Sequence, residues 1–544
     1  MTVASREKIV VFSNIKLPIN ASVEEAFIVA KRRLKRISPA SATSELFLFR
    51  RSIDARRRGD IRIVYSIAAK CEGTDALASA VAAEDNVSLV DTSMPELSQG
   101  ERELSSPPVI VGAGPAGIFA ALMLAQHGYA PVILERGGSV AERTEAVRRF
   151  TSEHILDVNS NVQFGAGGAG TFSDGKLVTR INDPLSAYVL ERFVEFGAPE
   201  EIKYMARPHV GTDVLSGVVD RMLDKIVALG GRVEYHTQFI SPVLSGRRIT
   251  AVKTSRGEIP TGALVLAVGH SARDTYSELI RLGAPLVAKD FSVGMRIEHL
   301  SSDIDEALYG DSAAHPSLGR AEYNLSTNTK SRGVYTFCMC PGGEVVAAAS
   351  EEHGVVVNGM SNHSRDGRNS NSAVVCSVFK SDYGATPESA IAFQRKIERD
   401  AYIAAGGDYR APIITVGDFL RGELKTEPKR IQPTYMGGKN VTLASPDLYL
   451  PSFVSNSIRG ALVDFDKRIK GFAASDAVLT GAETRTSAPI RILRDNDTRI
   501  ASGYDNLYPA GEGAGYAGGI TSAAIDGIRT AMALIKEYKP FDNC

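Results

Sequence analysis

Short apolar runs along the chain alternate with stretches whose hydrophobic residues recur at helical spacing. The run at 109–111 enters a glycine-rich turn and leaves as an apolar helix that reaches Leu122. A second apolar run, at 131–134, ends at an acid. A third, at 263–268, ends beside a glycine. Such runs are typical of buried parallel strands. They predict an α/β domain with a parallel sheet, to which a strand near 506–509 and a helix over about 521–536 also belong.

The rest of the pattern divides the chain into further regions. The first strands and a capped helix predict a small α/β module, and the acidic stretch that follows predicts a connector with some helix. Later, strand-like pieces and Gly/Asn/Ser loops predict a mostly β inserted domain. We therefore expect a Rossmann-like, discontinuous nucleotide-binding domain at 106–285 and 486–544, with the module at 1–70, the connector at 71–105 and the insertion at 286–485.

The turn after the first apolar run has the spacing Gly-x-Gly-x-x-Gly. In this pattern the glycines serve a tight turn, close approach of the backbone to phosphates, and helix-to-strand packing. The following helix offers free N–H groups and a positive dipole end to an anion. An acid at the end of the second strand is placed to hold ribose hydroxyls. The predicted dinucleotide-binding residues here are Gly112, Gly114, Pro115, Ala116, Gly117, Glu135 and Arg136.

A second glycine match, Gly165-Ala-Gly-Gly-Ala-Gly170, follows a polar segment and leads into Thr171-Phe-Ser-Asp-Gly-Lys176. It lacks the strand and helix of the first match. One interpretation is a loop whose backbone amides line an anion site, and the other is a plain flexible loop. On the first interpretation the contributing residues are Gly167, Gly168, Thr171, Ser173 and Asp174.

Composition adds constraints of class and compartment. The net charge is −1, but residues 1–70 carry an excess of Lys and Arg and residues 71–105 an excess of acids. The five cysteines are scattered and odd in number, which is typical of a reducing compartment. The chain shows neither a signal-like start nor an apolar run long enough to cross a bilayer. We expect a cytoplasmic protein without a membrane partner.

Taken in order, these pieces resemble the two-part FAD-binding domain of the glutathione-reductase-like flavoproteins. The segments 161–177, 269–275 and 337–343 are more narrowly similar to a family of uncharacterised bacterial FAD-dependent dehydrogenases. The resemblance covers nearly the whole chain and implies FAD as cofactor. It extends the cofactor-binding set to Gly269, Gly511, Glu512, Gly518, Gly519 and Ile520. In the wider class the residue at Glu512 is more often Asp, and the longer side chain can still reach a ribityl hydroxyl.

Hydride chemistry belongs to the flavin, so the protein need only place a donor and manage a proton. Cys338 and Cys340 form a Cys-x-Cys, which is either a thiol relay or a pair of small apolar residues. Tyr435 is placed either to orient a carbonyl or to pack in the core. Lys176 closes the glycine loop beside a candidate anion site. The lone histidines (His270, His299, His363) are interpreted as structural, and no metal-ligand spacing is present.

The sequence therefore predicts an FAD-dependent oxidoreductase acting on an unidentified small organic substrate. No second well-framed nucleotide turn is present, so NAD(P)H would reach the flavin from solution, or the substrate would reduce it directly. The basic helix with Lys31-Arg-Arg-Leu-Lys-Arg36 leaves open an FAD-containing protein that binds or modifies RNA. A flavoprotein scaffold without turnover is a third alternative. Oligomeric state and direction of reaction stay open.

Overall fold

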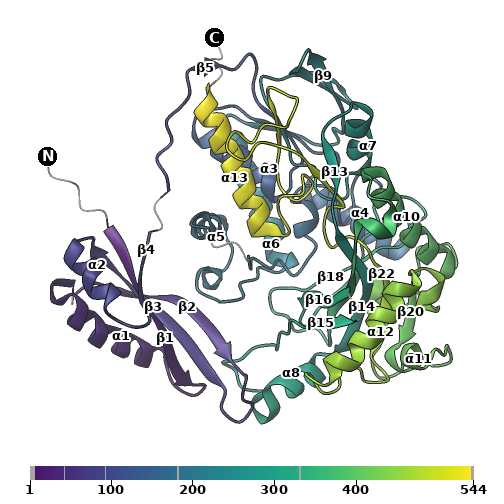
Figure 1. Cartoon of the computed structure of the whole chain (residues 1–544), viewed down its shortest axis with the longest axis horizontal. Coiled ribbons are helices and arrows are strands. Elements are labelled where there is room, and N and C mark those ends of the chain that lie inside the picture. The colour runs from purple at the N-terminus through teal and green to yellow at the C-terminus, as the bar shows by residue number, and fades with distance from the viewer. Residues whose placement is uncertain (1–6, 42, 92–93, 180–182, 330–331, 541–544) are drawn as a thin grey trace. The chain divides into compact units, whose positions relative to one another are not determined.

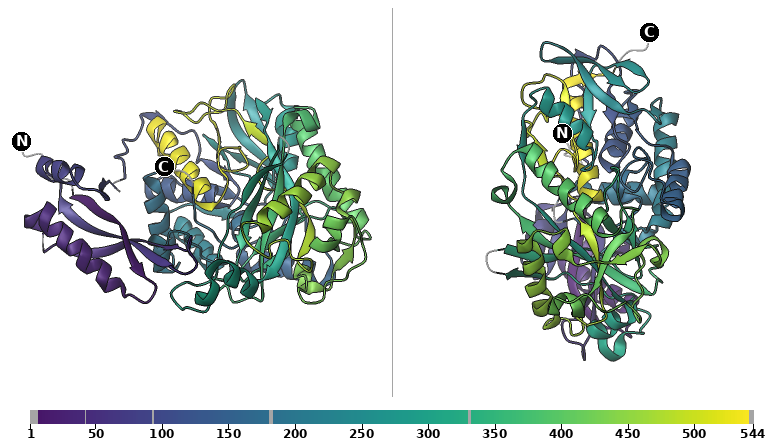
Figure 2. Two further views of the ribbon diagram at one scale, coloured as in Figure 1. Left: turned by 60° about the horizontal axis from the view of Figure 1, so that its bottom comes forward. Right: turned by 90° about the vertical axis from the view of Figure 1, so that its right-hand side faces the viewer.

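The computed structural model describes residues 7–41, 43–91, 94–179, 183–329 and 332–540. The chain divides into two compact units (Figures 1 and 2), each described by itself. The smaller unit contains the first 95 residues with the segments 177–209 and 305–321, and the larger unit contains the rest. Cys544 lies outside the described residues.

The smaller unit is built on one four-stranded antiparallel sheet. Its strand order is β2-β3-β1-β4, with bounds β1 (Glu7–Pro18), β2 (Leu46–Asp54), β3 (Arg62–Glu72) and β4 (Val87–Val90). The helices beside this sheet are α1 (Val23–Ile37) and α2 (Asp75–Ala82), and the segment 177–209 of the unit contains α5 (Leu185–Glu195). Ala26, Ala30 and Leu34 are the buried residues of α1, four residues apart, so one stripe of the helix is buried.

The segment expected to be an acidic connector differs from that expectation. Residues 71–105 include α2 and β4, and β4 pairs with β1 inside the first sheet. Glu84, between these two elements, pairs with Arg33 and Arg36 of α1. Glu84 thus neutralises part of the basic helix within one module.

The larger unit contains a five-stranded parallel sheet of order β24-β12-β6-β7-β8. Its strands are β6 (Val109–Val111), β7 (Val132–Leu134), β8 (Arg232–Glu234), β12 (Leu264–Leu266) and β24 (Leu507–Pro509). Helices α3 (Pro115–Gln126), α6 (Thr212–Ala228) and α13 (Ile520–Glu537) belong to the same half, and α13 packs on α3 (Figure 1). The predicted parallel sheet is therefore present, and the C-terminal strand completes one of its edges.

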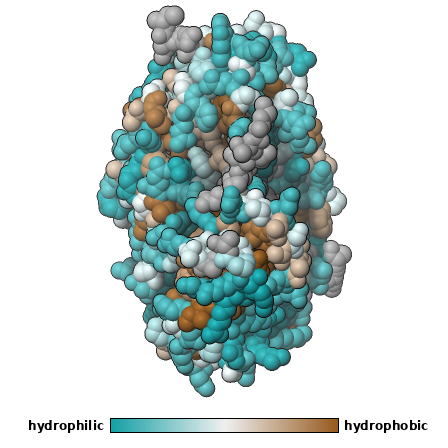
Figure 3. All heavy atoms as spheres, turned by 90° about the vertical axis from the view of Figure 1, so that its left-hand side faces the viewer, coloured by the Kyte–Doolittle hydropathy of each residue, from teal (hydrophilic) through white to brown (hydrophobic). Residues whose placement is uncertain are grey.

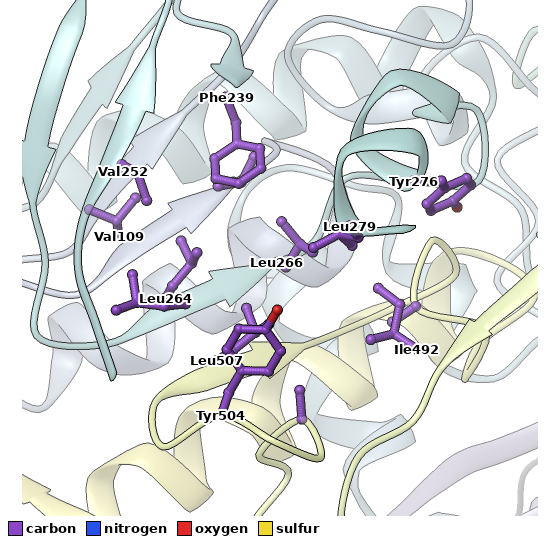
Figure 4. Packing of buried hydrophobic residues seen from close by; sticks show 14 of the residues in the cluster. Val109, Phe239, Val252, Leu264, Leu266, Tyr276, Leu279, Ile492, Tyr504 and Leu507 are labelled. Atoms are coloured by element: carbon purple, nitrogen blue, oxygen red, sulfur yellow. The ribbon is translucent and has the colours of Figure 1, made fainter. Parts of the chain in front are cut away.

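The central strands of the parallel sheet are uniformly apolar because both of their faces are buried. Val109, Leu264, Leu266 and Leu507 are each at most 1% exposed and lie in one cluster with Tyr276, as Figure 4 shows. The antiparallel strands β9 (Phe239–Ser245), β10 (Arg248–Thr254) and β11 (Gly257–Pro260) contribute further members of this cluster. Burial on both faces removes the alternation that would mark a half-exposed strand.

The region expected to be a mostly β insertion contains a seven-stranded mixed sheet of order β15-β16-β19-β14-β22-β20-β21. Helices accompany it, so the region is richer in helix than the sequence pattern indicates. The sheet strands are β14 (Phe291–Leu300), β15 (Ser326–Thr329), β16 (Arg332–Cys340), β19 (Asn369–Val378), β20 (Ala411–Thr415), β21 (Val441–Leu443) and β22 (Val478–Glu483), and the helices are α8 (Ser301–Tyr309), α9 (Lys380–Tyr383), α10 (Pro387–Ala404), α11 (Val416–Arg421) and α12 (Ser452–Asp466).

The remaining elements are short or peripheral. Two-stranded pairings join β17 to β18, β13 to β23 and β5 to β25. Among the described residues no helix is both long enough and apolar enough to cross a membrane. The face in Figure 3 is mostly hydrophilic, with smaller groups of hydrophobic residues between. The bounds are β5 (Arg102–Glu103), β13 (Leu286–Ala288), β17 (Glu344–Ala347), β18 (Val357–Met360), β23 (Ile490–Ile492), β25 (Tyr538–Lys539), α4 (Val140–Glu153), α5 (Leu185–Glu195) and α7 (Arg273–Arg281).

Candidate functional site

The first glycine turn joins β6 to α3 in the geometry that its sequence predicts. Gly112 has a φ of +103°, which side chains other than glycine rarely adopt. A Cβ on Gly117 would lie 1.9 Å from the Gly112 carbonyl oxygen, so this glycine lets the helix approach the turn. Gly114 caps α3 and Pro115 begins it, so the helix presents unpaired N–H groups at the turn.

Glu135 follows β7 and joins three backbone segments. Its Oε2 accepts from the Ala113 amide at 3.0 Å, and its Oε1 accepts from the amides of Gly137 and Gly165 at 2.9 and 3.0 Å. The side chain is 5% exposed. A carboxylate has about four acceptor positions, so one is left for a ligand hydroxyl. Next to it, Arg136 pairs with Asp274 and lies 4.4 Å from the centre of the Phe164 ring.

The second glycine loop lies directly against the first turn. The Gly167 amide donates to the Ala113 carbonyl at 2.8 Å, and a Cβ on Gly168 would lie 2.9 Å from the Gly114 Cα. Gly165, Gly167 and Gly168 all have positive φ. The loop is therefore a fixed backbone structure that needs its glycines, which disfavours the flexible-loop interpretation.

Arg143 on α4 (Val140–Glu153) organises this loop, although no motif in the sequence marks it. Its guanidinium is fully buried and donates to the carbonyls of Asn161, Val162 and Ala166 at 2.7 to 2.9 Å. Burial lowers its pKa to about 10, with no acid in direct contact in the described part of the chain. Because the guanidinium donates hydrogen bonds to several carbonyls of the loop, it fixes the orientation of their peptide planes. This role cannot be recognised from the sequence, because an arginine in an amphipathic helix is common.

Thr171 and Ser173 end the loop differently. The Thr171 hydroxyl is buried and has no hydrogen-bond partner among the described residues. Ser173 instead accepts from the Gly175 amide at 3.0 Å and donates to the Gly170 carbonyl at 2.7 Å, so it shapes the turn. A buried hydroxyl without a partner is costly, and a bound polar group next to the loop would remove that cost.

The C-terminal turn meets both glycine segments. A Cβ on Gly511 would lie 2.7 Å from the Ala116 Cβ, and a Cβ on Gly170 would lie 2.9 Å from Ile520. Asp526 on α13 holds the turn by accepting from the Gly511 amide at 2.7 Å. The sequence-predicted segments around 112–117, 165–171 and 511–520 therefore converge at one place in the larger unit.

Two predicted glycines at the start of α13 are open. Gly518 and Gly519 are exposed, and an added Cβ on either would meet nothing within 4 Å. Gly519, with a φ of +145°, caps the helix, so the N–H groups of the first turn point out of an uncovered end. An added Cβ on Gly269, after β12, would also meet nothing within 4 Å. A Cβ on Gly513 would lie 2.4 Å from the Gly269 carbonyl oxygen, so these two backbones are in close contact.

Glu512 is a partly buried acid within this convergence. Burial raises the pKa of its carboxyl to about 7, the Lys289 ammonium opposes that shift, and the Cys338 sulfur adds to it. The group is therefore able to hold a proton near neutral pH, unlike an ordinary glutamate.

Asp174 and Lys176, predicted to contact an anion, are committed to a buried network. The fully buried Asp174 pairs with Arg365 at 2.5 Å and with Lys176 at 2.6 Å, and Arg365 also pairs with Glu322 at 2.6 Å. Burial lowers the pKa of Lys176, but Asp174 and Glu322 outweigh burial and raise it. Lys176 thus stays charged, so it is poorly suited to act as a base.

Other candidates have structural partners. The Tyr435 hydroxyl donates to the Tyr409 carbonyl at 2.9 Å, and burial raises its pKa. His270 pairs through Nε2 with the Arg485 carbonyl at 2.9 Å, and burial lowers its pKa to about 4. His299 pairs in the same way with the Phe472 carbonyl at 2.8 Å. The described residues contain no group of three or more His, Cys, Asp or Glu side chains placed to hold a metal ion.

The converging turns fit a dinucleotide such as FAD. Gly114 is the decisive position, because a Cβ there would find ordinary contact with protein, 3.7 Å from Gly168 Cα, and nothing nearer. The fold itself therefore tolerates a side chain where the fingerprint has glycine. The open helix end, the spare acceptor on Glu135 and the unpartnered Thr171 hydroxyl lie around the same turns.

Comparison with known proteins identifies a matching family model and a close relative. Residues 290–486 match the family described as "FAD-dependent protein, C-terminal domain-like", and residues 11–70 match a domain of unknown function, DUF8436. An uncharacterized protein of Clostridium beijerinckii is 43% identical over 525 residues, covering 96% of this chain and 98% of its own. The chain belongs to the same family as that protein. None of these matches supports the RNA-binding hypothesis.

Solved flavoenzyme structures align with much of the chain at low similarity. The L-amino acid deaminase from Proteus vulgaris is 14% identical, and the alignment covers 83% of this chain and 98% of that one with a TM-score of 0.33. The glycine oxidase from Bacillus cereus is 11% identical, and the alignment covers 79% and 98% of the two chains with a TM-score of 0.34.

Proposed function

We propose that the protein is an FAD-dependent oxidoreductase whose larger unit binds FAD in a glutathione-reductase-like manner. The convergence of the turns 112–117, 165–171 and 511–520 is the observation that carries the proposal. The match of residues 290–486 to an FAD-dependent family supports it independently, because that match lies outside these turns.

In this proposal the main chain does most of the cofactor binding. The amides at the start of α3 and in the second glycine loop bind the pyrophosphate, and Glu135 accepts from a ribose hydroxyl. The start of α13, with Gly519 and Ile520, faces the flavin ring with its positive end. Arg136 is held by Asp274 and Phe164 beside Glu135, where it lines the adenosine end.

The flavin, when bound, supplies the hydride chemistry. The chain's own residues orient it and manage charge. Glu512 lies on the turn expected at the ribityl chain, where its carboxyl with a pKa of about 7 is able to donate a hydrogen bond in its protonated form. Asp526 fixes that turn through the Gly511 amide, so the carboxyl is held in place rather than carried on a mobile loop.

A direct test is the visible spectrum of the purified protein, followed anaerobically while NADPH and then NADH are added. A flavin band that bleaches supports a reductase that nicotinamide reaches from solution. A band that persists with both, but bleaches with an organic donor, supports a dehydrogenase of small organic substrates. The absence of a flavin band in protein purified with FAD throughout would refute the proposal.

A further inference from the structure

The Cys-x-Cys segment lies in an irregular part of β16. Phe337 pairs with Ala373 of β19, but the next pair is Cys340 with Asn371, so β16 contains one extra residue. Cys338 sits in that bulge with a φ of +44°, a conformation that residues other than glycine seldom adopt. Bulges of this kind re-aim side chains and are frequent beside active sites.

The irregular segment carries two thiols, two residues apart. The Cys340 thiol donates to the Cys338 carbonyl oxygen at 3.4 Å. Cys340 is buried, whereas Cys338 is partly exposed. The two thiols are thus unequal, with Cys340 inside and Cys338 partly open to solvent. A disulfide between them would close a Cys-x-Cys ring at the bulge.

A buried guanidinium lies beside both cysteines. The fully buried Arg296 guanidinium donates to the Cys338 carbonyl at 3.1 Å and lies 4.0 Å from the Cys340 sulfur. The hydrogen bond from Cys340, with help from Arg296 and Lys176, lowers the pKa of Cys338 to about 6, while the pKa of Cys340 is raised. Cys71 and Cys376 lack this setting, and burial raises the pKa of each.

The Cys338 sulfur also lies within electrostatic range of the candidate cofactor region. Cys338 interacts electrostatically with Glu512, which lies on the C-terminal turn, and with Lys176, which follows the second glycine loop. Both belong to the same compact unit as Cys338. A thiol pair built only for packing would not need a bulge, a buried guanidinium and this position together.

We infer that Cys338 and Cys340 form a redox-active dithiol that exchanges two electrons with the flavin, an inference that rests on the proposed FAD function. In the oxidising direction the Cys338 thiolate and the Cys340 thiol form one S–S bond, the Cys340 S–H bond breaks, and two electrons with that proton reduce the oxidised flavin to its anionic hydroquinone. In the other direction the reduced flavin restores the dithiol. Cys338 is the outer, attacking sulfur, and Cys340 is the inner, resolving one.

The test is an anaerobic dithionite titration of air-oxidised holoprotein, monitored at the flavin band. FAD alone takes two electrons, whereas FAD with an oxidised Cys338–Cys340 pair takes four. The expected result is four for the wild type and for the matched control Cys376→Ser, and two for Cys338→Ser and for Cys340→Ser. Two electrons for the wild type with all cysteines reduced would overturn the dithiol while leaving the flavin function intact.

A second measurement needs no variant and does not depend on how well the serine variants fold. The holoprotein, before and after dithionite, is unfolded anaerobically in urea and alkylated with iodoacetamide, so that the buried Cys340 is reached, and the peptide that contains both cysteines is weighed. The dithiol predicts no alkylation of the pair in the oxidised protein and alkylation of both after reduction. Full alkylation before reduction contradicts it. A protein without FAD overturns both proposals, and the missing flavin band distinguishes that failure from failure of the dithiol alone.

Discussion

The larger unit contains two contrasting polar regions. The three converging turns are made of main chain, and the groups they offer are amides and carbonyls shaped by positive-φ glycines. A second region is made of buried charged side chains, such as Asp174 with Arg365 and Arg296 with Glu483. The first region includes the open start of α13, at Gly518 and Gly519, whereas these charged side chains are enclosed by their partners.

The difference shows which polar groups are available to a ligand. A main-chain turn retains free N–H groups after the fold is complete, because helix starts leave them without partners. A buried charge is retained when other groups hold it, as Asp174 holds Arg365 and backbone carbonyls hold Arg143, so its partners already occupy it. In the proposed function, cofactor binding is therefore assigned to the turns, and the buried charged side chains contribute to the electrostatic potential around them.

The largest effects are expected from substitutions of two glycines in the first turn. Gly117→Val places a Cβ 1.9 Å from the Gly112 carbonyl and should prevent folding. Gly114→Val has no such clash, and the φ of −85° at Gly114 suits a valine. It should cost only about 1 kcal/mol through the weaker helix cap and yet abolish FAD retention. Circular dichroism and the bound flavin absorbance measure the two effects separately.

The controls for this pair are direct. Gly114→Ala should fold like the wild type and retain less FAD, because its methyl group is smaller. If Gly114→Val purified with full flavin content, the first turn would not contact the pyrophosphate.

A second prediction concerns the charged region. Arg296→Met leaves Glu483 buried without its cation, and breaking such a pair costs about 3–5 kcal/mol. The urea midpoint should fall clearly. Adding Glu483→Gln should recover most of the loss, because the unpaired charge is then removed. A double variant as unstable as the single one would mean that the arginine acts mainly through Asn371 and the Cys338 carbonyl.

The same contrast explains what the sequence was able to predict. Gly112 and Gly117 are recognisable because a backbone role demands one residue type at fixed spacing. Arg143 and Arg365 are not, because any arginine can serve a buried network and its partners lie far away in the sequence. The same limit applies to the sheets: β6 and β12 are buried on both faces and have distinctive apolar runs, whereas β4 is short and its burial depends on a partner strand, so the acidic stretch around it looked like a connector.

A third prediction uses pH. The cations Lys176 and Arg365 outweigh burial and lower the pKa of Asp174 from 3.8 to about 2. A carboxyl whose pKa is lowered on folding stabilises the fold above its unfolded pKa, and this contribution is lost as the pH falls through about 2. It is worth about 2 kcal/mol at neutral pH. The urea midpoint of Asp174→Asn should therefore lie below the wild type at pH 7, and the gap should narrow toward acid. A gap independent of pH would contradict the charged state of Asp174.

The smallest expected effect joins the two regions at Glu512. Burial raises its pKa from 4.5 to about 7, so this group favours folding at pH below its unfolded value, and that contribution is lost as the pH rises to about 7. Glu512→Gln cannot ionise. Between pH 5 and 8 its melting temperature should decrease less than that of the wild type, by roughly 2 °C. Glu322→Gln is a suitable comparison, because that carboxylate is held by Arg365 instead. Equal melting-temperature profiles against pH for Glu512→Gln and the wild type would show that Glu512 is ionised near neutral pH, like an ordinary glutamate. In the proposed function the turn would then present a carboxylate to the flavin instead of a hydrogen-bond donor.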